Sequence, residues 1–114
     1  MAKVSNEKKL EALKDWLKEN NIKFIENHKS QFGVTIDVKI QALRIAIFKS
    51  DGKEREDAIY NSSNGKYKLF KFYKPFFVRE SETKEFILEK IQTCCFDQMV
   101  KMQRRWEKEQ RKGK

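Results

Sequence analysis

The chain has 114 residues and a formal net charge of +9, with 38% of its residues charged and 39% hydrophobic. That length fits a single domain. A charge content this high is typical of disordered chains, but nine Phe, three Tyr and two Trp supply a core and exclude that class. No stretch approaches the ~18 apolar residues of a membrane span. The polar first five residues do not form a secretory signal, so we expect a cytoplasmic protein without membrane contact.

Lys and Arg outnumber Asp and Glu by 26 to 17. Such an excess favours polyanions, because binding releases the counterions condensed on a phosphate backbone. The charge balance therefore predicts DNA or RNA as a partner, with mere solubility as the alternative.

The two cysteines, Cys94 and Cys95, are adjacent in a predicted helix. Neighbouring helical residues point about 100° apart, so these two side chains cannot easily pair, and no Cys-x-x-Cys spacing indicates a metal site. We interpret them as buried apolar residues in a reducing compartment.

The first predicted element is an amphipathic helix from Ser5 to Asn20, capped by Ser5 or Asn6. Its apolar residues recur at steps of three and four, and they are Leu10, Leu13, Trp16 and Leu17. A short strand is expected over Ile22–Glu26. A second strand over 34–39 alternates strictly, which predicts Val34, Ile36 and Val38 on one face and Thr35, Asp37 and Lys39 on the other.

The run Leu43–Phe48 is nearly all apolar and predicts a central strand covered on both faces. Residues Lys49–Lys66 show little periodicity, so we expect an irregular segment with a helical turn around Glu54–Tyr60. A further strand is predicted over Tyr67–Tyr73, closed by Pro75.

A long helix follows, with Ser81 as its predicted cap and Glu82 and Glu85 in its first turn. Its apolar stripe comprises Leu88, Ile91, Cys95, Met99, Met102 and Trp106. From Glu82 to Gln110 the helix would measure about 43 Å, so its end is expected to project from the domain. Seven Lys or Arg stand against two Glu in 101–114.

This order predicts an α+β fold, with a small mixed β-sheet flanked by an N-terminal helix and a long C-terminal helix. We assign residues 1–96 to one domain and residues 97–114 to a basic helical extension.

The residues along this order resemble the PD-(D/E)XK nuclease superfamily, and within it the branch near the very-short-patch-repair endonucleases. The matching features are a Glu before a Leu in the first helix, a His after the first strand, a glycine before a mid-strand Asp, and Asp-Gly after the apolar strand. In this chain they are Glu7 and Leu10, His28, Gly33 and Asp37, and Asp51-Gly52. The resemblance covers residues 6–95 and implies a restriction-endonuclease-like core.

The resemblance also implies a site in which two or three carboxylates hold Mg²⁺. Asp37 matches the mid-strand ligand. The Glu expected at the end of the next strand falls on Phe48, or on Lys49 if the turn holds one extra residue, and neither side chain is a carboxylate. Asp51 is a substitute ligand, although Asp-Gly is also ordinary turn chemistry.

If the site is active, its candidate metal ligands are Asp37, Asp51 and Glu7, with Lys49 as the base that faces the phosphate. His28 matches a histidine near the family's active site, but a lone His after a strand is also commonly structural. Asp37 also has a structural alternative, which is to pair with Lys39 or Arg44.

Three functions remain open. The first is a catalytically impaired nuclease-like domain, without a cofactor, that binds DNA or RNA as an accessory factor. The second is an active Mg²⁺-dependent DNA endonuclease. The third is a protein-protein module that forms a homodimer or pairs with a partner helix through Met99, Met102 and Trp106. Nucleic acid would contact the cations of the last helix, which are Lys101, Arg104, Arg105, Lys108 and Arg111.

Overall fold

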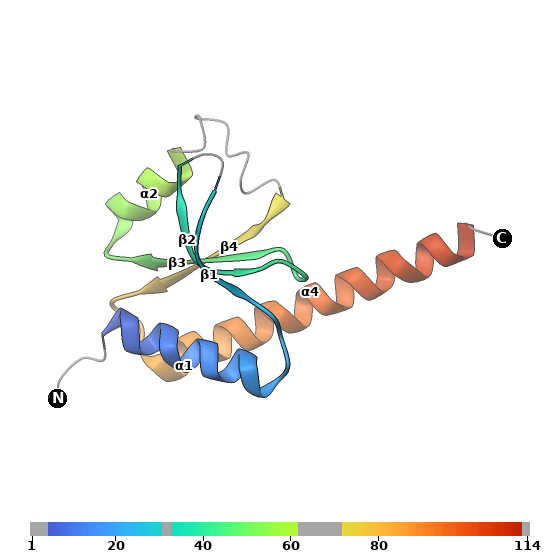
Figure 1. Cartoon of the computed structure of the whole chain (residues 1–114), viewed down its shortest axis with the longest axis horizontal. Coiled ribbons are helices and arrows are strands. Elements are labelled where there is room, and N and C mark those ends of the chain that lie inside the picture. The colour runs from blue at the N-terminus through green and yellow to red at the C-terminus, as the bar shows by residue number, and fades with distance from the viewer. Residues whose placement is uncertain (1–4, 31–32, 62–71, 113–114) are drawn as a thin grey trace.

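The computed structural model describes residues 5–30, 33–61 and 72–112. Four strands form one sheet in the order β1-β2-β3-β4. Helices α1 and α4 pack on one face of this sheet and α2 packs on the other (Figure 1). The bounds are α1 Asn6–Glu19, β1 Ile25–Lys29, β2 Thr35–Ile40, β3 Ile45–Ser50, α2 Lys53–Asn61, β4 Lys74–Arg79 and α4 Lys84–Lys112.

The sheet is mixed because two kinds of connection join its strands. Hairpins make β1, β2 and β3 antiparallel neighbours. Between β3 and β4 the chain passes through α2, and these two strands pair in parallel. A parallel pair needs such a crossover, since a tight turn can only reverse the chain. The predicted α+β class, with its mixed sheet and its two flanking helices, is confirmed.

Strand β3 is the central strand that its apolar run predicts. Ile45 and Ile47 belong to the core under α1 and α4, whereas Ala46 and Phe48 belong to the core under α2. All four are fully buried. The strand begins two residues later than predicted, because Leu43 lies in the four-residue turn 41–44 that follows Ile40.

Strand β2 does not keep the strict alternation that its sequence predicts. Val38 packs under α1 and α4, but Ile36 packs with the α2 cluster although it has the same parity. The ladder to β3 ends at the pair Val38 and Ile47. Beyond it, the Asp37 carboxylate accepts the Lys49 backbone N–H at 2.8 Å. A side-chain hydrogen bond thus replaces a backbone hydrogen bond between the two strands. From this point the residues of β2 with the same parity lie on the opposite face of the sheet.

Two other strand predictions need correction. The first strand runs over Ile25–Lys29 rather than Ile22–Glu26, since 22–24 form the connection from α1. Pro75 lies inside β4 rather than closing a strand before it. Its missing N–H is tolerated because β4 is an edge strand of the described sheet. Of the strand predicted over Tyr67–Tyr73, residues 67–71 lie outside the described residues, and Phe72 and Tyr73 are not in a strand.

The segment after β3 is more regular than predicted. It turns at Gly52, whose φ of 139° favours glycine, and continues as α2. The helical turn expected around Glu54–Tyr60 is therefore a helix of nine residues. Its Ile59 is buried against the sheet.

Polar residues terminate α1 at both ends. The Ser5 hydroxyl accepts the Lys8 N–H, as expected of a cap. At the other end Asn21 has a φ of 56°, and the Ile22 N–H reaches the Leu17 carbonyl at 2.8 Å. This Schellman arrangement satisfies carbonyls that the last helical turn leaves open.

The cap of α4 is Thr83 rather than Ser81. The Thr83 hydroxyl accepts the Phe86 N–H at 3.1 Å. Ser81 and Glu82 lie in the turn before the helix, where the Glu82 N–H donates to the Arg79 carbonyl. Glu85 is in the first turn, as predicted.

The buried face of α4 differs in part from the predicted stripe. Ile91 and Cys95 are buried, together with Ile87 and Cys94, whereas Met99 and Trp106 are exposed. Gln98 shares the packed side, and its amide donates to the Leu43 carbonyl at 3.1 Å. An apolar pattern cannot reveal a polar residue such as Gln98 on the packed side.

The packed part of α4 ends at Met102, which contacts the core. Every residue of 103–111 is exposed, and the helix extends past the sheet as expected (Figure 1). No helix in the part of the chain that the structure describes is both long and apolar enough to cross a membrane.

Both cysteines are free and buried, as predicted. Burial raises the pKa of the Cys94 thiol above 9.0, and it raises the pKa of Cys95 to about 12. Because only the thiolate reacts, both groups are chemically quiet at neutral pH.

We therefore expect neither thiol to react quickly with a thiolate-specific disulfide reagent at pH 8, and both to react at once in denaturant. The raised Cys95 pKa also predicts that stability falls as pH rises from about 9 towards 12, since only the unfolded thiol ionises in that range. Thiol release followed by absorbance measures the first effect, and urea unfolding of Cys95→Ala beside the parent chain isolates the second. Rapid labelling of the native protein would contradict this account of the thiols.

Candidate functional site

The carboxyl ends of β3 and β4 meet at one edge of the sheet. The strands are parallel, and their last paired residues are Ser50 and Arg79. The start of α1 lies against the same edge, because the Asn6 amide donates to the Ser50 carbonyl at 3.2 Å. In sheets with parallel strands this edge commonly carries the ligand site.

A buried lysine fixes α1 in this position. Lys9 is 2% exposed, and its Nζ donates to the carbonyls of Arg79 at 3.2 Å and Glu80 at 3.1 Å. These carbonyls belong to the last residue of β4 and the residue that follows it. A buried charge requires such partners, and two carbonyl oxygens supply them.

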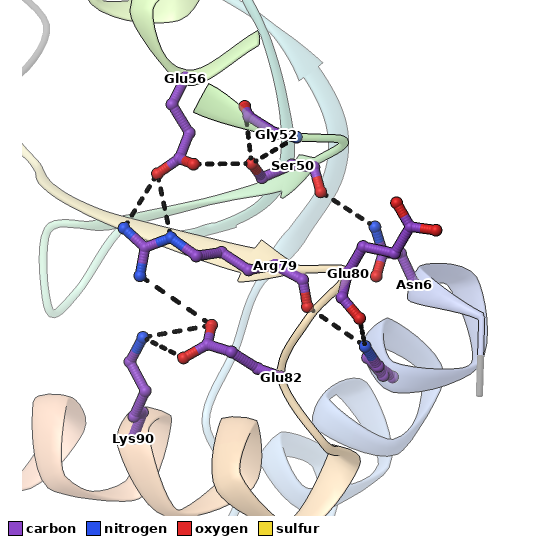
Figure 2. A network of polar contacts seen from close by, with 9 residues as sticks. Asn6, Ser50, Gly52, Glu56, Arg79, Glu80, Glu82 and Lys90 are labelled. Atoms are coloured by element: carbon purple, nitrogen blue, oxygen red, sulfur yellow. Dashed lines mark hydrogen bonds and ion pairs between the residues drawn. The ribbon is translucent and has the colours of Figure 1, made fainter. Parts of the chain in front are cut away.

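A network of carboxylates and cations continues from this point through β4 to α2 and α4. Figure 2 shows Glu56 and Glu82 on either side of the Arg79 guanidinium. Glu56 accepts two Arg79 hydrogen bonds, at 2.9 and 3.2 Å, and one from the Ser50 hydroxyl at 3.0 Å. Glu82 pairs with Lys90 of α4 at 3.1 Å and with Arg79 at 4.0 Å. The Glu56 hydrogen bonds raise the pKa of Arg79, which stays charged.

A cleft of about 680 Å³ opens beside this network. The start of α1, the end of β3 and the first turns of α2 contribute to its walls. Its lining residues are Ser5, Asn6, Glu7, Lys49, Asp51, Arg55 and Glu80. Three of the five catalytic candidates from the sequence, Glu7, Lys49 and Asp51, therefore line this cleft.

The other two candidates lie outside the lining. Asp37 is buried, and its carboxylate accepts the N–H of Lys49, which lines the cleft. It pairs with neither Lys39 nor Arg44, the structural partners expected from sequence; the Lys39 ammonium lies 5.2 Å from the Tyr73 ring centroid. His28 is on the edge strand β1, opposite Ile36.

The cleft contains carboxylates without the arrangement of a metal site. Lys49 Nζ lies 3.9 Å from Glu7 Oε1, so one candidate ligand faces a cation. Within 5–30, 33–61 and 72–112, no three His, Cys, Asp or Glu side chains form a group that could hold a metal ion. Phe48, where the resemblance requires a carboxylate, is fully buried, with its ring centroid 5.7 Å from that of Phe77.

The predicted nucleic-acid residues lie on the exposed part of α4, away from the cleft. Lys101, Arg104, Arg105, Lys108 and Arg111 are all exposed. Among the described residues none of these five takes part in an ion pair. Of the residues predicted to pair with another helix, Met99 and Trp106 are exposed and Met102 packs on its own domain.

Sequence reasoning missed the residues that hold the carboxyl ends of β3 and β4 together with α1 and α2. Glu56 and Arg79 are 23 positions apart, and their pairing depends on the α2 crossover, which no local pattern reveals. Lys9 did carry a signal, because it precedes Leu13 by four residues and so shares the apolar face of α1. Comparison of the chain with protein-family models, with curated proteins and with solved structures gives no match.

Replacing Lys9 by Met should lower the free energy of unfolding by about 2 kcal/mol, because two carbonyls lose a charged donor. Urea unfolding should show a lower midpoint with an unchanged slope. Lys8→Met is the matched control: Lys8 is exposed on the same turn, and its replacement should stay within about 0.5 kcal/mol of the parent. Equal effects of the two substitutions would contradict the role given to Lys9.

Proposed function

We propose that this chain binds nucleic acid as an accessory factor and does not cleave it. The observation that carries the proposal is the set of exposed cations on α4 without ion-pair partners among the described residues. Cations left free by the protein are the ones that can replace counterions on a phosphate backbone. The net charge of +9 adds a long-range attraction of the same sign.

The cleft supports the second half of the proposal. Its three carboxylates, Glu7, Asp51 and Glu80, do not form a group that could hold a metal ion in the part of the chain that the structure describes. Apolar Phe48 occupies the position of the expected ligand. We propose that the core is a degenerate relative of the PD-(D/E)XK nucleases, which the gathering of Glu7, Lys49 and Asp51 supports. The proposal includes a cytoplasmic location, supported by two free buried thiols.

Pairing with another helix is the second candidate function. Met99 and Trp106 favour it, because α4 presents both to solvent beside the basic residues. Like charges on two copies of this helix oppose self-association, so nucleic acid remains the better-supported partner. Molar mass from light scattering at several concentrations separates a dimer from a monomer.

Replacing Arg104, Lys108 and Arg111 by Gln in the full chain should weaken binding to fluorescent DNA and RNA. It should also flatten the dependence of log affinity on log salt, by about one unit for each phosphate that the protein no longer neutralises. Fluorescence anisotropy at several salt concentrations measures both quantities.

The matched control removes three exposed lysines from other surfaces, by replacing Lys8, Lys18 and Lys29 with Gln. This variant has the same net charge as the first one but keeps α4 intact, so its salt dependence should stay near that of the parent. Equal reductions in affinity for the two triple variants would mean that net charge alone, rather than α4, governs binding.

Plasmid and single-stranded DNA should remain intact with the protein in Mg²⁺ or Mn²⁺, because Phe48 stands where the second metal-binding carboxylate is expected. Gel electrophoresis over a time course measures this. Cleavage that disappears in Asp37→Asn would show instead that the site is active. That variant keeps an oxygen acceptor for the Lys49 N–H, so an inactive variant would not simply report an unfolded protein.

A further inference from the structure

A groove of about 480 Å³ lies between the edge strand β4 and α4, separate from the cleft at the strand ends. Its lining includes four aromatic rings, which are Tyr60, Phe76, Phe77 and Phe86, together with the cations Lys74, Arg79 and Lys90. Arg79 and Lys90 are paired with Glu56 and Glu82 in the network described above. Phe76 and Phe77 face opposite sides of the sheet, so the groove follows both sides of the β4 edge. None of the four rings takes part in the proposed contact with phosphates or lines the cleft.

Phe86 is the ring that this groove offers to solvent. It is 47% exposed, whereas Phe76 and Phe77 are buried. The Lys90 ammonium lies 5.5 Å from the Phe86 centroid and 5.4 Å from that of Phe76. An exposed aromatic ring can stack a nucleobase. Lys90 is paired with Glu82 at 3.1 Å, so phosphates must find their cations elsewhere.

The groove and the basic end of α4 belong to the same side of one helix. Phe86, Lys90, Thr93 and Asp97 line the groove. Continuing at the same steps of three and four residues leads to Lys101, Arg104, Lys108 and Arg111, which we call the basic row. At about 1.5 Å per residue, the side from Phe86 to Arg111 extends about 38 Å.

We propose that single-stranded nucleic acid lies along this side of α4, with bases stacked in the groove at Phe86 and phosphates on the basic row. This inference rests on the proposed nucleic-acid binding and narrows it to one class of strand. A duplex has its bases stacked inside and presents phosphates, so it would use the basic row but not the ring.

The carboxylates of the groove favour the same assignment. Glu89 and Asp97 are exposed in its lining. They repel phosphate, so the groove itself is a poor path for the backbone. A base is neutral, and its exocyclic amino group can donate to a carboxylate, as cytosine does to Glu or Asp. The groove is therefore suited to bases, and the phosphates follow the cations beyond Asp97.

The test uses the full chain and fluorescein-labelled oligonucleotides about twenty nucleotides long, of mixed sequence, as single strands and as duplexes of DNA and of RNA. The parent protein should bind the single strands more tightly than the duplexes. Phe86→Ala should weaken single-strand binding about tenfold, as expected when one base is no longer stacked, and change duplex binding less than about twofold. Phe86→Leu should behave like Phe86→Ala, and Phe86→Tyr should retain binding, because only the ring matters.

The matched control is Phe96→Ala, which removes a ring 66% exposed on the same helix but outside the groove lining. It should leave both affinities unchanged. Full single-strand affinity in Phe86→Ala and Phe86→Leu, or an equally weakened Phe96→Ala, would overturn the base site while leaving nucleic-acid binding in place. A parent protein that binds neither strand form would overturn both proposals, and concentration-dependent dimerisation in that case would assign α4 to a second copy.

Discussion

The ammonium of Lys9 sets the position of much of this molecule. A charge so deeply buried must lie where acceptors are, and its acceptors are the carbonyls of Arg79 at the end of β4 and of Glu80 just after it. Helix α1 can therefore dock in only one direction, with its first turn at the carboxyl edge of the parallel strands. The cleft exists because this turn closes one side of it. The same contact holds the turn that leads from β4 to Glu82, and Glu82 in turn pairs with Lys90 of α4.

Residues whose environment is local were predictable, and residues whose environment is assembled across the chain were not. The apolar run of β3 indicated a strand covered on both faces, and Ile45 to Phe48 are fully buried as expected. Ser5 caps α1 by a contact within the helix, and the helix ends at Glu19, next to the predicted end at Asn20, so sequence sufficed there too. For β2 the predicted faces were wrong, because a strict alternation requires an unbroken series of backbone hydrogen bonds, which the Asp37 carboxylate interrupts. The prediction that Pro75 ends a strand was wrong, because proline disrupts an interior strand but is tolerated in an edge strand such as β4.

The candidate site shows the same division. Glu7, Lys49 and Asp51 are candidates from sequence and the fold gathers them, yet the distances between them depend on the way α1 docks on the strand ends. The exposure of the α4 cations could be anticipated from their density, since few core faces could accommodate seven basic residues in fourteen. The groove at Phe86 could not be anticipated, because Phe76 and Phe86 line it from the two sides of the turn 79–82, and the sequence predicted that the helix starts within that turn, at Ser81.

About two thirds of helix α4 packs on the domain and the rest extends beyond it, which has a thermodynamic consequence. Starting a helix is the unfavourable step, whereas extending one is nearly neutral. The packed residues up to Met102 supply the start, so the exposed residues need only extend a helix that the core has already formed. Opposing that extension are like charges four residues apart, such as Arg104 and Lys108. A polyanion lying along these residues, as we propose, would remove the repulsion. The core would then determine where the helix begins, and such a ligand how far its order persists.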